Sequence, residues 1–301
     1  MNIPRIPMIV NAYGLTDVGL VRKNNEDNFL FTQLGSGLIN SIPATETNLV
    51  TPWIFIVADG MGGGQAGEVA SQMAVELVAD KFAARVSQKR IATQQGFEKA
   101  LGGAVEEANR TVFQKGQNKD DLRGMGTTIT AAAVCGTSAI FAQLGDSRAY
   151  LLRDSDVRQM TKDQSLVAQM VAMGKLRPEE AKTHPRRNVI LQALGVQPRV
   201  DVVITSTELR KGDRLVLCSD GLWGKVEAEE IKEFVERFPP QTACESLVRL
   251  ANERGGEDNI TVLIASFSGD GVPGTTEDEV SKLLPVIRRR WWWFWPWNQK
   301  G

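Results

Sequence analysis

The chain has 301 residues, of which 42% are hydrophobic and 24% are charged. Its 35 Lys and Arg residues nearly balance its 36 Asp and Glu residues, which leaves a formal net charge of −1. This composition is typical of a globular protein and excludes a largely disordered chain. The even charge balance gives no overall attraction for nucleic acid. The length allows one large domain or two small ones, each with enough residues for a core.

The cysteines and the single histidine limit the kinds of site that the chain can build. Cys135, Cys218 and Cys244 are odd in number and show no CxxC spacing. This excludes a disulfide scaffold or a cysteine zinc site and suits a reducing compartment. His184 is the only histidine, so a histidine-rich metal site is excluded as well. The chain lacks a run of about 18 apolar residues and a signal-peptide hydrophobic region, which predicts a soluble, cytoplasmic protein.

Apolar runs and apolar stripes predict the secondary structure in chain order. Two stripes with helical spacing predict neighbouring helices: Ala70, Ala74, Leu77, Val78, Phe82 and Val86 form the first, and Phe97, Leu101, Ala104, Val105, Ala108 and Val112 the second. One strand is predicted before them and five after them, from apolar or β-branched runs bounded by Gly, Asp or Ser: Trp53–Ala58, Thr128–Cys135, Ser138–Leu144, Arg148–Arg153, Arg214–Cys218 and Asn259–Phe267.

The spacing between successive strands predicts the type of sheet. Strand runs separated by only two to four residues, as between Val134 and Ala139 and between Leu144 and Arg148, predict antiparallel hairpins. The fold class is therefore predicted to be α+β with substantial antiparallel sheet, not a regular βαβ alternation.

The character of the sequence changes after Phe267. Residues 9–267 are predicted to form one domain, and residues 268–301 a flexible linker followed by a tail. Five of the seven tryptophans lie within Trp291–Trp297, directly after Arg288–Arg290. This segment is too short to span a bilayer, but Trp favours the headgroup level and arginines are attracted to anionic lipid. The tail is therefore interpreted as a peripheral anchor at an anionic membrane surface, with a disordered tail or a protein-docking segment as the alternatives.

Acidic residues recur where predicted strands begin or end. Glu26 and Asp27 lie just before the apolar run Phe29–Phe31, and four aspartates lie next to other strands: Asp59, Asp146, Asp220 and Asp258. Each one alone is also explained as a turn former. Because a carboxylate is costly to bury alone, however, acids at several strand ends together indicate a shared counter-charge. With no suitable histidine or cysteine, the donors are all oxygen, which favours Mg²⁺ or Mn²⁺ over zinc.

A competing motif lies beside the first of these acids. Gly62, Gly64 and Gly67 spell G-x-G-x-x-G between a predicted strand and a predicted helix, as in a dinucleotide-binding turn. The rest of that fingerprint is missing, because the nearest downstream acid, Asp80, lies within the helical stripe. A charged Asp59 would also repel a pyrophosphate. The dinucleotide interpretation is therefore disfavoured.

Seven short motifs follow one another along the chain: Thr16–Asn28, Val57–Ser71, Gly124–Thr128, Leu144–Tyr150, His184–Gly195, Cys218–Trp223 and Gly256–Val262. In sequence and in order they resemble the motifs of the metal-dependent (type 2C, PPM) Ser/Thr protein phosphatases in their compact bacterial form. The resemblance implies two stacked antiparallel sheets flanked by pairs of helices, an α/β/β/α sandwich. It also implies hydrolysis of phosphoserine and phosphothreonine monoesters by a water that two metal ions activate at one end of the sandwich.

The same resemblance implies which residues hold the metal ions. Asp59 would bridge two ions, with Glu26 and the Gly60 carbonyl on one of them and Asp220 and Asp258 on the other. The ions would be Mn²⁺ or Mg²⁺.

Three further residues are assigned by the same motifs. Asp27 would orient metal-bound waters from behind the ligands. Asp146 would help to hold a third metal ion. Arg22 would bind the phosphate of the substrate, because a guanidinium matches phosphate oxygens bidentately.

The chain departs from the family pattern at several positions. Met61 and Gly64 stand where the family often has a histidine that protonates the leaving alcohol. His184 lies in a motif near the family's mobile flap and is expected to have a structural or flap-positioning role. Gln164 replaces a histidine at the start of the corresponding flap segment here, Asp163–Gly195, and Gly224 replaces an acid that would support a third metal ion.

Two classes of function thus remain open. The first is a phosphatase acting on phosphorylated proteins, the substrates of a Ser/Thr kinase. The alternative is a catalytically weak phosphoprotein-binding or membrane-surface adaptor with the same fold. In either case no nucleic-acid partner is expected. The chain is predicted to be a cytoplasmic monomer, peripheral at the inner membrane surface if the tail binds lipid.

Overall fold

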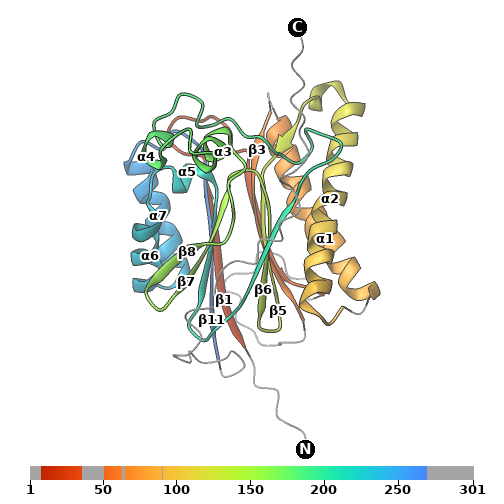
Figure 1. Ribbon diagram of the computed structural model, residues 1–301, viewed down its shortest axis with the longest axis vertical. Helices are drawn as coiled ribbons and strands as arrows, with labels where there is room; N and C mark the ends of the chain where they lie inside the picture. The colour runs from red at the N-terminus through yellow and green to blue at the C-terminus, as the bar shows by residue number, and fades with distance from the viewer. Residues whose placement is uncertain (1–7, 36–50, 63–64, 90, 270–301) are drawn as a thin grey trace, which may run out of the picture.

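The computed structural model describes residues 8–35, 51–62, 65–89 and 91–269 of the chain. Two β-sheets pack face to face in the middle of the molecule, and helices cover the outer face of each sheet (Figure 1). Most of the predicted linker and the whole Trp-rich tail lie outside the described residues, and so does Gly64. Among the helices that are described, none has both the length and the apolar character needed to cross a bilayer.

The strands of both sheets pair antiparallel throughout the described residues. One sheet has the order β1-β11-β10-β7-β8, formed by Ile9–Asp17, Ile260–Ser268, Arg214–Cys218, Arg148–Arg153 and Asp156–Gln159. The other has the order β2-β3-β5-β6-β9, formed by Asp27–Gln33, Trp53–Met61, Ile129–Cys135, Ser138–Leu144 and Val203–Glu208, and the short β4, Gly126–Thr127, pairs with the end of β3. The predicted α+β class with antiparallel sheets is confirmed. The parallel βαβ unit of a dinucleotide-binding motif is not formed around β3.

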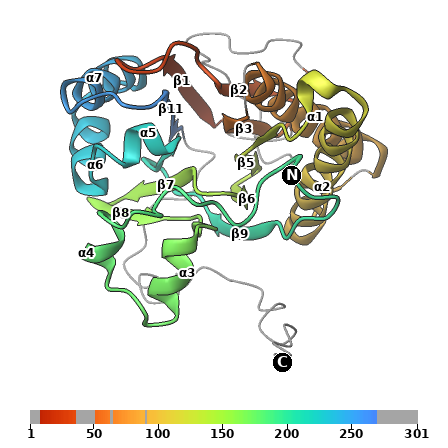
Figure 2. The ribbon, with the colours of Figure 1, turned by 90° about the horizontal axis from the view of Figure 1, so that it is seen from above.

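Two pairs of helices form the outer layers. Helices α1 (Ala66–Lys89) and α2 (Gln94–Asn118) cover the sheet that contains β3, and a 3₁₀ turn at Asp120–Leu122 follows them. Helices α6 (Ala228–Arg237) and α7 (Pro240–Glu253) cover the other sheet. Three short helices lie at one end of the sandwich (Figures 1 and 2): α3 (Leu166–Ala172), α4 (Pro178–Ala181) and α5 (Asp220–Trp223).

The alternation of side chains along a strand explains how one sheet serves two cores. On β3, Ile54 and Ile56 pack toward α1 and α2, whereas Phe55 and Val57 pack toward the opposite sheet. All four side chains are fully buried. Full burial of a side chain of this size contributes about 1.5–3 kcal/mol, so the run Trp53–Ala58 is strongly fixed in place. The three cysteines are also buried, and each is a free thiol.

The chain changes sheets between β6 and β7, and here one sequence prediction is wrong. The hairpin predicted between Leu144 and Arg148 does not form, because β6 pairs with β5 and β9 whereas β7 pairs with β10 and β8. The crossing is made at Gly145, whose φ of 103° is a left-handed conformation that favours glycine. A side chain there would also meet Cβ of Thr128 at 2.8 Å. The hairpin predicted at Val134 and Ala139 does form, as β5–β6.

Candidate functional site

The predicted acidic residues come from both sheets and lie at the same end of the sandwich. Asp27 and Asp59 stand opposite each other in the β2–β3 pair, whereas Asp220 begins α5 directly after β10. Asp146 lies in the loop that crosses between the sheets. Burial is the main cause that raises the pKa of Asp59. The charges of four nearby aspartates raise it further: Asp27, Asp220, Asp146 and Asp258. The structure therefore brings these carboxylates together in space.

Glu26 is fitted closely against the start of α1. Its backbone carbonyl accepts a hydrogen bond from the Gly60 amide at 3.1 Å. A methyl group on Gly67, in the first turn of α1, would stand only 2.5 Å from Oε2 of Glu26. Glycine is therefore required at position 67 to leave space for this carboxylate. The last glycine of the G-x-G-x-x-G motif thus makes room for Glu26, which is a different role from cradling a dinucleotide.

Asp27 is held from beneath by the opposite sheet. The Ser219 hydroxyl donates to Oδ2 of Asp27 at 2.7 Å, and the Thr261 amide donates to the same hydroxyl oxygen at 2.9 Å. Burial raises the pKa of Asp27 to about 7, although the hydrogen bonds from Thr261 and Ser219 oppose that shift. Its Oδ1 atom is buried and has no hydrogen-bond partner among the residues that the structure describes. Asp27 is thus one fixed carboxylate with an oxygen left over for a further ligand.

Asn259 is a part of the site that the sequence reasoning missed. Its Oδ1 accepts from the Glu26 amide at 2.9 Å, and its Nδ2 donates to the carbonyls of Val18 and Asn24, each at 2.9 Å. One side chain next to Asp258 therefore fixes the loop that carries Arg22 and Glu26. Its position directly after an acid in G-E-D-N was the only sequence signal, and an asparagine in a turn is common for other reasons.

Arg22 lies at the exposed mouth of the site. Its Nη2 donates to Oδ2 of Asp258 at 2.8 Å, and the two side chains are 55% and 35% exposed. This hydrogen bond is the largest of the contributions that raise the Arg22 pKa, and the charges of Glu26 and Asp59 add to it. The guanidinium is thus held beside the acids at the surface of the site.

Asp146 is the most enclosed of the acids outside the β2–β3 pair. Its side chain is 3% exposed, and its Oδ1 has no partner among the described residues. Burial raises its pKa to about 8, and the nearby charges of Asp220 and Asp163 add to the shift. For Asp220 burial is again the main cause, with the charge of Asp258 next, and the pKa is raised to about 6.

These carboxylates form an acidic centre in which charge is poorly compensated. Several buried acids repel one another. Among the described residues, Arg22 reaches them from the mouth, and the charge of Arg148 acts to lower the pKa of Asp146. No three Asp, Glu, His or Cys side chains of the described residues stand together as a ready-made metal-binding group. The donor set nevertheless suits a hard divalent cation, because it is all oxygen and includes buried carboxylate atoms without partners on Asp27 and Asp146. A bound cation would relieve both the repulsion and the unpaired oxygens.

His184 lies in the flap segment, after α4. Its Nδ1 accepts a hydrogen bond from the Arg186 amide at 3.1 Å, and its carbonyl accepts one from the Arg187 amide at 3.0 Å. Both contacts shape the turn that follows α4. They agree with the structural role expected for His184.

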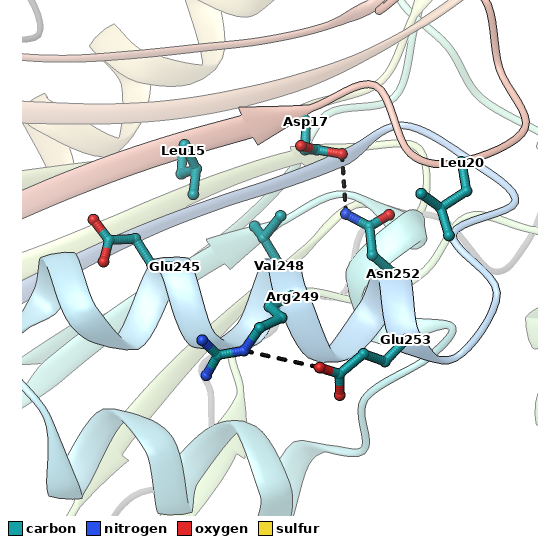
Figure 3. A pocket seen from close by; sticks show the side chains of 8 residues that line it. All are labelled: Leu15, Asp17, Leu20, Glu245, Val248, Arg249, Asn252 and Glu253. Carbon is teal, nitrogen blue, oxygen red and sulfur yellow. Dashed lines mark hydrogen bonds and ion pairs between the residues drawn. The ribbon is translucent and has the colours of Figure 1, made fainter.

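A surface cavity of about 480 Å³ lies between the end of β1 and α7 (Figure 3). None of its lining residues belongs to the predicted acidic site: Leu15, Asp17, Leu20, Glu245, Val248, Arg249, Asn252 and Glu253. Asn252 donates to Asp17 at 3.1 Å, which closes one side of this cavity. The acids that the sequence predicts for the chemistry therefore lie apart from this cavity, at the acidic end of the sandwich.

Comparison with known proteins gives consistent matches. Residues 44–253 match the family model described as Protein phosphatase 2C. The "Serine/threonine phosphatase stp" of Listeria monocytogenes is 38% identical over 250 residues, which are 83% of this chain and 92% of that protein. A solved structure of the S. agalactiae serine/threonine phosphatase superposes with a TM-score of 0.74 at 34% identity, covering 85% of this chain and 98% of the other. The catalytic domain of the phosphatase PstP, solved in complex with 2 manganese ions, has a TM-score of 0.70 at 33% identity and covers 87% and 99%.

Proposed function

Because this chain belongs to the protein phosphatase 2C family and is a protein phosphatase, we propose that it hydrolyses phosphoserine and phosphothreonine monoesters with divalent cations held among its carboxylates. One observation carries the metal-dependent part of this proposal. Acids from both sheets meet at one end of the sandwich, where burial and mutual repulsion raise their pKa values. Such a group is stable in its ionised form only with a counter-charge.

The residues that would hold the cations follow the assignment from the sequence. Asp59 would be shared by two ions, with Glu26 and the Gly60 carbonyl on one side and Asp220 and Asp258 on the other, and Asp146 would serve a third. Bound Mn²⁺ or Mg²⁺ supplies a water nucleophile at neutral pH and neutralises the phosphoryl oxygens. The PstP structure with 2 manganese ions supports this choice of ion.

The remaining roles belong to the protein's own side chains. Ser219 fixes one oxygen of Asp27, and the other is buried without a hydrogen-bond partner among the described residues, so that it could orient water. Arg22 has several N–H donors, so it can contact Asp258 with one and a phosphate with others. Met61 stands where the family often has a histidine that protonates the leaving alcohol, so in this chain that proton would come from a different donor.

The alternative function is a phosphoprotein-binding or adaptor protein with weak turnover. The missing turn histidine is the feature that favours it. All of the predicted acidic ligands are present in the sequence, which favours catalysis instead.

Phosphate release from a phosphothreonine peptide separates these two functions. We expect turnover with Mn²⁺ or Mg²⁺, and the rate with Mg²⁺ can be the lower of the two at equal concentration. Removing the ions with a chelator should abolish turnover, because water alone is a weak nucleophile at neutral pH. Restoring the ions should restore the rate. Peptide binding without phosphate release at saturating Mn²⁺ would support the adaptor and contradict the proposal.

Replacing Arg22 with Ala is expected to raise KM more than it lowers kcat. A guanidinium that binds the phosphate does so in the ground state as well as in the transition state, and a hydrogen bond to a charged group contributes about 1.5–3 kcal/mol, or roughly 10- to 150-fold in KM. Lys23→Ala is the matched control, because Lys23 is the exposed cation next in the chain. An unchanged KM with a collapsed kcat would contradict phosphate binding by Arg22 in the ground state.

We further propose that the protein works on phosphoproteins made by a Ser/Thr kinase, as a cytoplasmic monomer that the C-terminal tail brings to an anionic membrane. Sedimentation with vesicles tests the tail. We expect binding that needs anionic lipid, weakens with added salt and disappears when Val280–Gly301 is removed, with peptide phosphatase activity retained. Equal binding to neutral vesicles, or none, would contradict the anchor and leave the phosphatase proposal standing.

A further inference from the structure

The loop that carries Asp146 is held by residues distant in sequence. Gln164 contacts the residue before Asp146 with both its backbone and its side chain. Oε1 of Gln164 accepts from the Gly145 amide at 2.8 Å, and the Gln164 amide donates to the Gly145 carbonyl at 2.8 Å. Nε2 of Gln164 donates to the carbonyl of Asp201 at 2.8 Å, so the side chain is fixed at both ends.

Asp146 itself is held from the other sheet by Trp223. The indole Nε1 of Trp223, at the end of α5, donates to the Asp146 carbonyl at 3.0 Å. Arg148 stacks on the indole ring at 3.7 Å and binds Asp163, with Nη2 of Arg148 2.7 Å from Oδ2 of Asp163. Asp163 directly precedes Gln164. Gln164 and Trp223, which both bind the backbone of this loop, are therefore connected to each other through Arg148 and Asp163.

The far end of the flap segment reaches Asp59. Leu194 exchanges two backbone hydrogen bonds with Thr127, at 3.0 and 2.8 Å. The Thr127 hydroxyl in turn donates to the carbonyl of Asp59 at 2.9 Å. The two ends of the flap segment are also paired with each other, at Ser165 and Ile190. The flap segment is thus bonded at one end to the backbone beside Asp146 and at the other to the backbone of Asp59.

We propose that Gln164 and Trp223 are positioning residues that set the carboxylate of Asp146 relative to Asp220, and that Gln164 couples this carboxylate to the flap segment. This role rests on the proposed function, in which Asp146 binds a cation. Neither residue needs to touch the cation or the substrate. Each acts through the backbone on either side of the Asp146 side chain, whose buried Oδ1 has no partner of its own.

The chemistry of the Gln164 side chain supplies the matched variants. Gln164 must accept a hydrogen bond from one backbone group and donate one to another, which leucine cannot do and a neutral imidazole can. Trp223→Phe removes the N–H together with one ring of the indole, and it keeps an aromatic face for Arg148. Gln192→Leu is the control. Gln192 is an amide side chain of the same segment, but its Oε1 accepts from the Asp201 amide at 3.3 Å, whereas Oε1 of Gln164 accepts from the Gly145 amide beside Asp146.

Titration of the full chain with Mn²⁺ by calorimetry tests the proposal, with Asp146→Asn marking the binding step that depends on this carboxylate. We expect Gln164→Leu and Trp223→Phe to weaken that same step by about 10- to 100-fold and to leave the tighter steps and Tm nearly unchanged. Gln164→His should restore the step, and Gln192→Leu should match the wild type.

Three results would overturn the proposal. The first is a Gln164→Leu isotherm that superposes on the wild type while Asp146→Asn loses its step. The second is an equal loss at every step accompanied by a fall in Tm, which would show general damage. The third is a wild-type protein without any Mn²⁺ step that depends on Asp146, which would also remove Asp146 from the proposed function, whereas the first two results leave that function intact.

Discussion

Replacing Asp59 with Asn is expected to reduce kcat by about 10³-fold at saturating Mn²⁺ and, at the same time, to stabilise the metal-free fold. The activity falls because an amide cannot supply the negative charge that two cations would share, and a metal ion contributes several kcal/mol to the transition state, at about 1.4 kcal/mol per decade. The stability rises because Asp59 is the carboxylate on which four other aspartates act unfavourably. A loss of activity together with a gain in stability would show that Asp59 serves the reaction at the expense of the fold.

Peptide phosphatase kinetics and thermal unfolding in chelator measure the two effects. Asp80→Asn is the matched control, because Asp80 is an exposed acid on α1, and neither quantity should change in it. An Asp59→Asn protein that keeps near wild-type turnover in saturating Mn²⁺ would contradict the assignment of Asp59. A protein that loses both activity and stability would show that Asp59 is needed for the fold.

The metal-free protein is expected to become more stable as the pH is lowered from 8 to 6. The pKa values of Asp146 and Asp27 are raised to about 8 and about 7, mainly by burial. In this range the folded state takes up protons that the unfolded state, with carboxyl pKa values near 4, does not bind. Each proton contributes up to about 1.4 kcal/mol per pH unit. A total of roughly 3–4 kcal/mol corresponds to a rise in Tm of roughly 6–16 °C for a domain of this size.

Thermal unfolding at several pH values, with chelator and with Mn²⁺, measures this effect. With Mn²⁺ bound the trend should vanish or reverse, since protons then compete with the cation for the same oxygens. Asp146→Asn should remove part of the slope. Carboxylates with lowered pKa values, such as Glu230 at about 2, titrate far below this range and do not contribute. A metal-free Tm that is constant or falls from pH 8 to 6 would contradict the raised pKa values.

The parts of the fold that could be predicted are those in which one strand or helix carries its own signal. The run Trp53–Ala58 is buried on both faces and reads as a strand without any context, although β3 continues to Met61. Strand β1 was missed because its burial alternates and it contains Gly14, where a side chain would meet the ring of Phe29 at 2.4 Å. Strand β9, Val203–Glu208, is largely polar and only its partner β6 makes it a strand.

The acidic residues of the site could be predicted from the sequence, but the neutral residues that hold them in place could not. Acids at strand ends are visible in the sequence, and charge repulsion explains why they need a common partner. Ser219 and Asn259 are neutral, and they contact residues 192 and 233 positions away, Asp27 and Glu26. No local pattern contains such a pairing. The ion pair between Arg22 and Asp258 was likewise beyond the sequence, because it depends on how two loops from opposite ends of the chain meet.

The pairing of β1 with β11 has a consequence for how the protein matures. Asp17 pairs with Ile260, so the five-stranded sheet is closed only by the last strand of the described chain. During synthesis Glu26, Asp27 and Asp59 leave the ribosome long before Asp220 and Asp258 exist. The acidic centre therefore cannot act as a nucleus for folding, and the capture of cations must follow the docking of the two sheets. A chain cut short before β11 would lack the strand that joins β1 to β10, and we expect such a chain to be inert.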